Sequence, residues 1–280
     1  VVLPVSLHTL HLGHSLKFPA IPAWLCSLHQ LTTLSIAIHV DTRAPRCSTT
    51  STPELPGAVP DFLSELPIAS LSIDGVDLRE CSVLRNMAIQ QLSLSVDTWA
   101  DGVPAPGTDR QRNLSSLTML LDETVLMRSL RVLRLPNHRL ESLPHCMNGM
   151  QLRAIELQST GLRELPPWLG LMPLMYLGIA QTKVREFPDS FVNLSTLHRV
   201  EIECWNLSDE ALDDIEQQIT PLSRAQPQVR FFFDILNRYD ELPPERPVWH
   251  AGIGYSLADA VWYAEGANDS ASDSSHFGVE

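Results

Sequence analysis

The chain has 280 residues, of which 44% are hydrophobic and 19% charged, with 21 Pro and a net charge of −13. This apolar content excludes a disordered chain, and the absence of any uninterrupted run of ~18 apolar residues excludes a membrane-spanning helix. The negative charge argues against nucleic acid and anionic membranes as partners. Most of it is local, because residues 201–280 hold 16 acids and 4 bases, whereas residues 1–200 hold 17 and 16.

A six-residue frame, L-x-x-L-x-L with Ile or Val allowed, recurs unevenly in the first half of the chain. Its copies there begin at Leu7, Leu31, Ile68 and Ile89. Two segments rich in Pro, Ser, Thr, Gly and charge, 41–59 and 99–112, are predicted to be loops inserted between copies. We interpret Leu117-x-x-Leu120 as a ninth, degenerate copy.

The frame becomes regular in the second half, where successive copies begin 22, 22 and 23 residues apart, at Leu130, Leu152, Leu174 and Leu197. Its alternating apolar residues predict a short strand with one buried face. A proline follows the first three copies, at positions 144, 166 and 188, and excludes a regular helix before it. We therefore expect a short helical or 3₁₀ turn there, with these residues facing the interior: Trp168, Leu169, Leu171, Phe191, Val192 and Leu194.

One such coil cannot cover its own apolar face, so neighbouring coils must stack on a parallel sheet. This pattern resembles the leucine-rich-repeat family, and the 22–23-residue units are similar to its intracellular members from plants, protists and bacterial effectors. The resemblance covers about residues 5–205. It implies an α/β, right-handed solenoid of eight or nine coils, with the sheet on the concave side and loops and short turns on the convex side. The asparagine that the family places after the strand is replaced here by His138, Thr160 and Thr182.

The resemblance also implies that the outward positions of the strands bind a protein partner. One outward column reads Thr9, Thr33, Ser70, Gln91, Met119, Val132, Ala154, Tyr176 and Arg199. The other reads His11, Ser35, Ser72, Ser93, Leu121, Arg134, Glu156, Gly178 and Glu201. The late units hold residue types that anchor interfaces, so we predict this partner-binding site: Arg134, Glu156, Tyr176, Arg199 and Glu201. The alternative is an inert sheet face, with binding at the insertions or at an edge.

After residue 205 the repeat pattern stops, and we divide the chain into repeats (1–205), a cap (206–263) and a disordered acidic tail (264–280). A helix is predicted from Ser208 or Asp209, ending before Pro221, and a second one over residues 256–263. The cap would cover the apolar end of the last coil, as repeat proteins require. A separate functional module is the alternative interpretation of this region.

No segment predicts catalysis, a cofactor or a metal site. The residues Gly254-Tyr-Ser256-Leu-Ala258 resemble a nucleophile elbow but lack its last glycine, and His8, His11 and His14 point in different directions. The five cysteines are far apart, which favours a reducing compartment and hence the cytoplasm. We therefore expect a non-catalytic, monomeric binding module. One alternative is the recognition arm of a larger enzyme or receptor, such as a ubiquitin-ligase-type effector or a kinase; another is an extracellular domain, which would need cysteine pairs at its caps.

Overall fold

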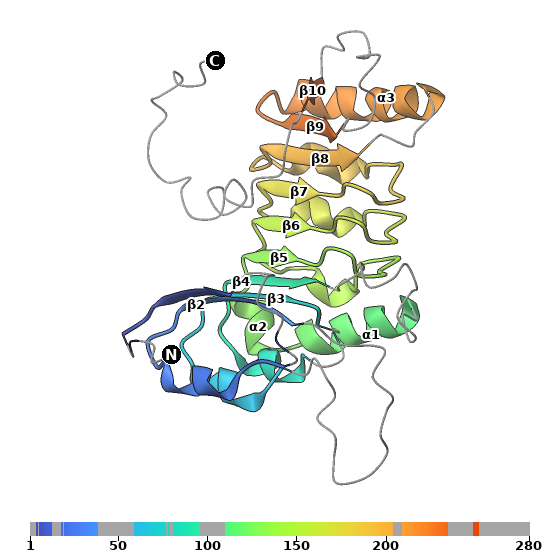
Figure 1. The fold of residues 1–280 in the computed structure, drawn as a ribbon. Coiled ribbons are helices and arrows are strands. Elements are labelled where there is room, and N and C mark those ends of the chain that lie inside the picture. Colours follow the sequence, from blue (N-terminus) through green and yellow to red (C-terminus); the bar gives the residue numbers. More distant parts are fainter. Residues whose placement is uncertain are drawn as a thin grey trace, which may run out of the picture.

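One parallel β-sheet runs through the protein (Figure 1). The computed structural model describes residues 4, 6–12, 18, 20–38, 59–76, 78, 81–95, 110–203, 209–234 and 249–251. Within these residues, ten strands pair strictly in chain order: β1 (Thr9–Leu12), β2 (Thr33–Ala37), β3 (Ser70–Asp74), β4 (Gln91–Ser95), β5 (Val132–Arg134), β6 (Ala154–Glu156), β7 (Tyr176–Gly178), β8 (Arg199–Glu203), β9 (Arg230–Asp234) and β10 (Trp249–Ala251). The fold is an α/β solenoid of the leucine-rich-repeat type.

Each of the eight clear L-x-x-L-x-L frames forms one strand, so the predicted strands β1–β8 are confirmed. The register follows the frames, because equivalent apolar residues pair directly, for example Leu34 with Leu71 and Leu133 with Ile155. The last two apolar residues of a frame point into the core, where Leu92 and Leu94 are fully buried. The residues between and beside them form the opposite sheet face, here called the concave face.

The prediction of a ninth copy at Leu117-x-x-Leu120 is wrong. These residues lie in helix α1 (Arg110–Leu121), and strand β4 pairs directly with β5. An L-x-x-L spacing also fits a helix, in which residues three and four apart share one face. Leu117, Leu120 and Leu121 all face the core, and a second helix, α2 (Val125–Ser129), follows with Thr124 as its N-cap. These two helices replace the usual turn on the convex side of this coil. The predicted loops fall mostly outside the described residues.

Short 3₁₀ turns form the convex side of the other coils: η1 (Ala23–Ser27), η2 (Asp61–Glu65), η4 (Ser82–Asn86), η5 (His145–Met147), η6 (Pro167–Leu171) and η7 (Asp189–Asn193). Five of these six turns follow a proline directly, and the predicted turns after Pro144, Pro166 and Pro188 are confirmed. Proline lacks an N–H but keeps its carbonyl, which accepts the first hydrogen bond of the turn. In η6, for instance, Leu169 N donates to Pro166 O at 3.0 Å.

The 3₁₀ geometry also corrects the expected orientation of two side chains. Leu169 and Phe191 point into the core as predicted, but Leu171 is 76% and Val192 45% exposed. A 3₁₀ helix has three residues per turn, so positions three apart share a face and the positions between them turn outward. Leu169 therefore shares its inward face with Met172 and not with Leu171.

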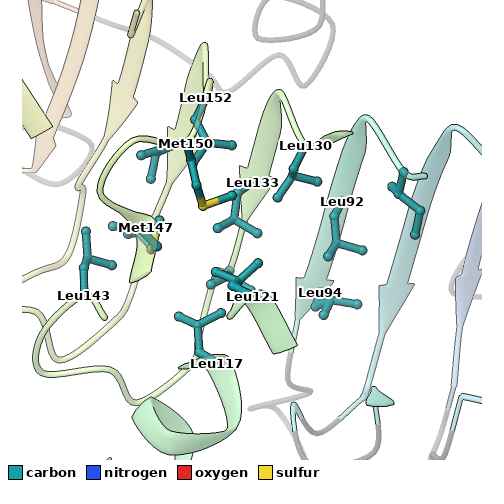
Figure 2. Close-up of a cluster of buried hydrophobic side chains, with 14 of the residues drawn as sticks. Leu92, Leu94, Leu117, Leu121, Leu130, Leu133, Leu143, Met147, Met150 and Leu152 are labelled. Carbon is teal, nitrogen blue, oxygen red and sulfur yellow. The ribbon is translucent and has the colours of Figure 1, made fainter. Parts of the chain in front are cut away.

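A single apolar core extends through all the coils, from Ile21 in the first to Phe231 near the end. Figure 2 shows its middle section, where Leu117 and Leu121 of α1 point toward Leu94 and Leu133 of the sheet. The strands supply one wall of this core and the turns and helices supply the other. Stacking of incomplete coils, predicted from the sequence, thus explains the buried leucines.

The turns after β5, β6 and β7 repeat one backbone conformation. Asn137, Ser159 and Gln181 adopt φ values of +65°, +56° and +56°, each one residue before the position where the family has asparagine. At those positions Thr160 and Thr182 donate to the carbonyls of Leu157 and Ile179, at 2.9 and 2.8 Å. The two threonines therefore hydrogen-bond the turning backbone at the positions of the family's asparagine.

Helix α3 (Asp209–Ala225) and strands β9 and β10 lie together at the C-terminal end (Figure 1). The predicted helix start is confirmed, but the helix continues past Pro221 to Ala225. Proline removes one backbone hydrogen bond, and the burial of Leu222 beyond it stabilises the last turn. The parallel sheet also continues past residue 205, because β9 pairs with β8. The predicted helix at 256–263 and the tail at 264–280 lie outside the described residues.

Candidate functional site on the concave face

The concave face carries two straight columns of outward side chains, in the register predicted from the frames. Thr9 pairs with Thr33, Thr33 with Ser70 and Ser70 with Gln91, and the same column continues through Val132, Ala154, Tyr176, Arg199 and Arg230. Met119 and Leu121 do not belong to these columns, because both lie on α1: Met119 is exposed there and Leu121 is buried in the core.

Over strands β2–β4 the two columns are neutral and rich in hydroxyl groups. The second column consists of serines there, and all of its side chains are partly exposed: Ser35, Ser72 and Ser93. Beyond these columns, the last residues of β3 and β4 contact each other. Ser95 Oγ donates to Asp74 Oδ1 at 2.6 Å. Hydroxyl groups both donate and accept hydrogen bonds, so this half can match many polar partners.

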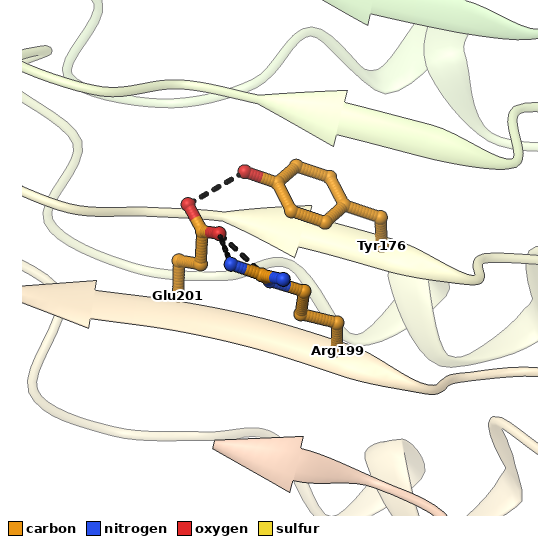
Figure 3. A network of polar contacts seen from close by, with 3 residues as sticks. All are labelled: Tyr176, Arg199 and Glu201. Atoms are coloured by element: carbon orange, nitrogen blue, oxygen red, sulfur yellow. Dashed lines mark hydrogen bonds and ion pairs between the residues drawn. The ribbon is translucent and has the colours of Figure 1, made fainter. Parts of the chain in front are cut away.

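Over β7 and β8 three of the predicted site residues form one network (Figure 3). Tyr176 Oη donates to Glu201 Oε2 at 2.8 Å, and Arg199 Nε donates to Glu201 Oε1 at 2.8 Å. A second guanidinium nitrogen, Arg199 Nη2, lies 2.7 Å from the same carboxylate oxygen. Burial, together with the neighbouring carboxylates Glu201 and Glu156, raises the pKa of Tyr176 well above its usual value. The phenol therefore stays neutral and acts as a donor.

Gly178 determines how the Tyr176 ring lies. These two residues are neighbours on the same face of β7, and a Cβ atom at position 178 would meet Tyr176 Oη at 2.8 Å and Cε1 at 3.2 Å. The ring therefore lies along the strand over the glycine, which brings its hydroxyl to Glu201 on β8. Any larger side chain at position 178 would occupy the space of the ring.

Arg134 and Glu156 form a second group on β5 and β6. Arg134 Nε lies 3.2 Å from Glu156 Oε2, an ion pair whose geometry is not that of a hydrogen bond. Nε and Nη2 of Arg134 are thus buried without a hydrogen-bond partner. Burial raises the pKa of Glu156, while Arg134 opposes this shift and Glu201 adds to it. Desolvation by burial is therefore the largest influence on this carboxyl, and it outweighs the attraction of Arg134.

The five predicted residues are all on the concave face, but they are turned toward one another and are largely covered. Tyr176 is 5%, Arg134 7% and Glu201 8% exposed. Tyr176 also packs on Val132 and Ala154, in a small apolar cluster separate from the main core. Their charges are matched within the face, so this half is a closed, rigid platform and not a set of protruding side chains. Contact of these residues with a partner stays a prediction.

Two residues important to this face were missed in the sequence. Gly178 was placed in the outward column from the sequence. The repeat frame does not show, however, that the ring of Tyr176 lies flat over this glycine. Arg230 extends the column onto β9. The sequence could have predicted this position, because the buried residues Val229 and Phe231 on either side of it continue the strand pattern one coil beyond the last complete frame. The single basic residue between them is exposed.

Comparison with known proteins gives no relative: no protein-family model matches the chain, and no curated protein sequence matches it significantly. Among the residues that the structure describes, none of the helices has the length and apolar character needed to cross a membrane. The same residues contain no cluster of three or more His, Cys, Asp or Glu side chains suited to a metal ion. A function for this chain must therefore be inferred from its fold and from the side chains on its surfaces.

Proposed function

We propose that the chain is a leucine-rich-repeat protein that binds another protein, without catalysis, through its concave face. The family assignment is supported by eight L-x-x-L-x-L frames with one strand each, and by the 22–23-residue spacing of the second half. The pairing of β1–β9 in one unbroken order also supports it, because stacked coils bring each strand beside the next strand of the chain.

The observation that carries the binding proposal is the continuity of the two outward columns over nine strands. They combine a neutral part, which offers hydroxyl groups, with a part whose ion pairs and hydrogen bonds hold its side chains in place. A preorganised surface loses little side-chain entropy on binding, which favours affinity. At ~4.8 Å between strands, eight strand spacings extend the face over about 38 Å, enough for a partner of domain size.

Two paired variants test this function by affinity capture with the full chain as bait. Ser72→Arg with Gln91→Arg places bulky charges on the neutral part of the concave face. Ser82→Arg with Asn86→Arg places the same charges on turn η4 of the convex side, where both residues are exposed. The wild type and the convex variant should retain the same main partner, and the concave variant should lose it. Retention by a concave variant with an unchanged circular dichroism spectrum would refute the proposal.

A third variant, Tyr176→Ala with Arg199→Glu, tests the five predicted site residues in the same assay. We expect it to lose the partner, because it removes two of the three members of the Glu201 network. If this variant is folded and captures the partner unchanged, the five residues are not the binding site, and the neutral part of the face over β2–β4 becomes the candidate. Circular dichroism and a urea titration provide the fold control, since the variant leaves Glu201 without these two partners.

We further propose that the protein acts as a monomer in the cytoplasm. The described cysteines support a reducing compartment, because Cys26, Cys81 and Cys146 form no disulfide bond. Labelling of these thiols in unbroken cells, followed by mass spectrometry, should find them reduced.

A further inference from the structure

One arginine of the concave face has two buried donors that no acceptor fills. Arg134 lies on β5, its side chain is 8% exposed, and its Nε and Nη2 are buried without a hydrogen-bond partner. These two nitrogens lie on the same edge of the guanidinium group, here called the fork, which can donate to both oxygens of one carboxylate. Buried polar groups are hydrogen-bonded in the great majority of cases, so two adjacent exceptions require an explanation.

Arg199 on β8 shows how the same edge of a guanidinium is used when an acceptor is in place (Figure 3). Its Nε donates to Glu201 Oε1 at 2.8 Å, and its Nη2 lies 2.7 Å from the same oxygen. Glu201 comes two residues later on the same strand, so the two side chains share a face. On β5 the residue that shares a face with Arg134 is Val132, which has no acceptor. An acceptor for the Arg134 fork must therefore come from another strand or from another molecule.

The acid on the neighbouring strand reaches Arg134 but does not fill the fork. Glu156 lies opposite Arg134 on β6, and its Oε2 is 3.2 Å from Arg134 Nε. Its Cγ also lies only 3.3 Å from the position that a Cβ atom of Gly178 on β7 would take, so the side chain leans away from β5. This lean accounts for a pair that is held by charge and not by a directed hydrogen bond. Glu156 is also the more exposed side chain of the two, at 19%.

The other neighbour of Arg134 belongs to the neutral part of the concave face. Ser93 lies opposite Arg134 on β4, and the same column continues through Ser72 and Ser35, all of them partly exposed. The column therefore runs from three hydroxyl groups to one guanidinium group over three strand spacings, which amount to about 14 Å. An extended peptide of about four residues, at ~3.3 Å per residue, covers this distance.

We propose that the fork of Arg134 binds an acidic side chain of the protein partner, in a segment that lies over the serines of β2–β4. This inference rests on the proposed function, since it names the chemistry that the partner presents to the concave face. The partner's carboxylate replaces that of Glu156 at the fork, and Glu156 turns outward to water. The exchange is favourable because two charge-assisted hydrogen bonds replace an ion pair that has none. The fork is buried, so a long side chain reaches it more easily than a chain terminus does.

Fluorescence anisotropy tests the proposal on the full chain with a labelled octapeptide of Ser and Asn that carries one central Glu and is capped at both ends. In two further probes Gln replaces the Glu, and one of them ends in a free carboxylate. The capped Gln peptide shows whether the carboxylate is needed, and the uncapped one shows whether a chain terminus supplies it. The measurements use about 20 mM salt, where screening acts only beyond ~20 Å.

Two conservative variants, each with a matched control, locate the binding. Arg134→Lys keeps the positive charge and removes the fork, so it separates bidentate binding from simple attraction. Its control is Arg163→Lys, at an exposed position outside the strands. Glu156→Gln removes the competing carboxylate, and Glu164→Gln makes the same change in charge at an exposed position.

We expect the Glu peptide to bind the wild type about tenfold more tightly than either Gln peptide. Arg134→Lys should weaken its binding about tenfold, and Glu156→Gln should strengthen it about threefold, because the fork no longer has an internal competitor. Both controls should stay within about twofold of the wild type. If the ion pair had only a structural role, Glu156→Gln would not strengthen binding.

Nuclear magnetic resonance of the wild type, labelled with ¹⁵N-arginine, observes the fork directly. The Nε–Hε signal of Arg134 is assigned by its loss in Arg134→Lys. It should show the largest shift of all arginine Nε signals when the Glu peptide is added, and the capped Gln peptide should leave it in place. An unmoved Arg134 signal in the presence of bound Glu peptide would overturn the proposal.

Three results of the anisotropy assay would also overturn it. The first is equal binding of the Glu peptide and the capped Gln peptide by the wild type. The second is an equal gain in Glu156→Gln and Glu164→Gln, which would show a long-range charge effect. The third is tightest binding of the peptide with a free carboxylate end, which would assign the fork to a chain terminus.

These outcomes are separate from those of the capture assay. Loss of capture by Ser72→Arg with Gln91→Arg, together with equal binding of the Glu and Gln peptides, rejects only the Arg134 fork. Binding of the Glu peptide that depends on Arg134, together with unchanged capture by the concave variants, rejects only the concave face as the site of the main partner.

Discussion

At the scale of single residues, Tyr176 lies flat on the sheet because its neighbour on the same face has no side chain. The Gly178→Ala variant tests this arrangement. The new methyl group meets the hydroxyl end of a movable side chain and not the backbone, so the ring should swing away and lose its bond to Glu201. Because hydrogen bonds to charged groups are worth about 1.5–3 kcal/mol, we expect the free energy of unfolding to fall by about 1–2 kcal/mol.

A double-mutant cycle with Tyr176→Phe isolates this effect. Phenylalanine has no hydroxyl to collide with the methyl group and no bond to lose, and only the 3.2 Å contact with Cε1 of the ring remains, so Gly178→Ala should cost clearly less in that background. Urea unfolding of the four proteins gives the coupling energy, expected to be about 1 kcal/mol or more. Additive effects of the two substitutions would contradict the proposed role of Gly178.

The ion pair of Glu156 gives a prediction for pH. The pKa of this carboxyl is raised in the folded state above the value near 4.5 of an ordinary glutamate, so folding favours its protonated form. Its contribution to stability is therefore fully present below pH ~4.5 and is lost as the pH rises through the folded pKa. Urea unfolding of the wild type and Glu156→Gln at several pH values should show the wild type losing stability relative to the variant as the pH rises. A wild type that gains stability relative to the variant as the pH rises would show that Arg134 outweighs desolvation.

At the scale of elements, the 3₁₀ turns of neighbouring coils touch where one of them carries a glycine. A Cβ atom at Gly170 of η6 would lie 2.4 Å from Ser190 O of η7. Since this atom belongs to the backbone, the two turns must separate, and Gly170→Ala should cost about 2–4 kcal/mol of stability. Gly161→Ala is the matched control: its Cβ would lie 3.4 Å from Leu140 O, an ordinary contact, and the substitution should be neutral or slightly stabilising. Equal effects of both in thermal unfolding would contradict the close packing of η6 and η7.

The elements that repeat were predictable, and so was the start of the single helix α3, whereas helix α1 was not. The eight strands and the turns after proline follow from local patterns that recur at equivalent places, so each copy supports the others. Helix α1 has no second copy, and its Leu117-x-x-Leu120 spacing fits a strand frame as well as a helix. A proline ends most helices. At Pro221, however, the burial of Leu222 against the last coil outweighs the lost hydrogen bond, and α3 continues.

The candidate site was predictable only in part, for a related physical reason. Strand alternation placed Arg134, Glu156, Tyr176, Arg199 and Glu201 on one face, and the register confirms that placement. Their pairing into two covered groups depends on side-chain direction and on the space over Gly178, which no frame encodes.

At the scale of the whole molecule, each coil is supported only by its neighbours. Every strand pairs with the next in chain order, and the core is one continuous column of leucines. Stability in such a solenoid is close to a sum of nearest-neighbour terms, so damage at one end should weaken that end first. Helix α3 covers the C-terminal end, where Gln218 accepts from Phe187 N at 3.0 Å and Gln226 donates to Val192 O at 2.6 Å.

The Ile219→Asp variant tests this view of the molecule. Ile219 lies on α3 and is fully buried, and an unpaired carboxylate there should detach the helix from the last coil. Hydrogen exchange followed by mass spectrometry should then show faster exchange in peptides covering β8 and β9, while those covering β2–β4 keep wild-type protection. In a globular domain with one shared, cooperative core, the same substitution would accelerate exchange throughout. Uniform loss of protection would therefore refute the nearest-neighbour description, and a gradient from β9 toward β2 would give the length over which one coil supports the next.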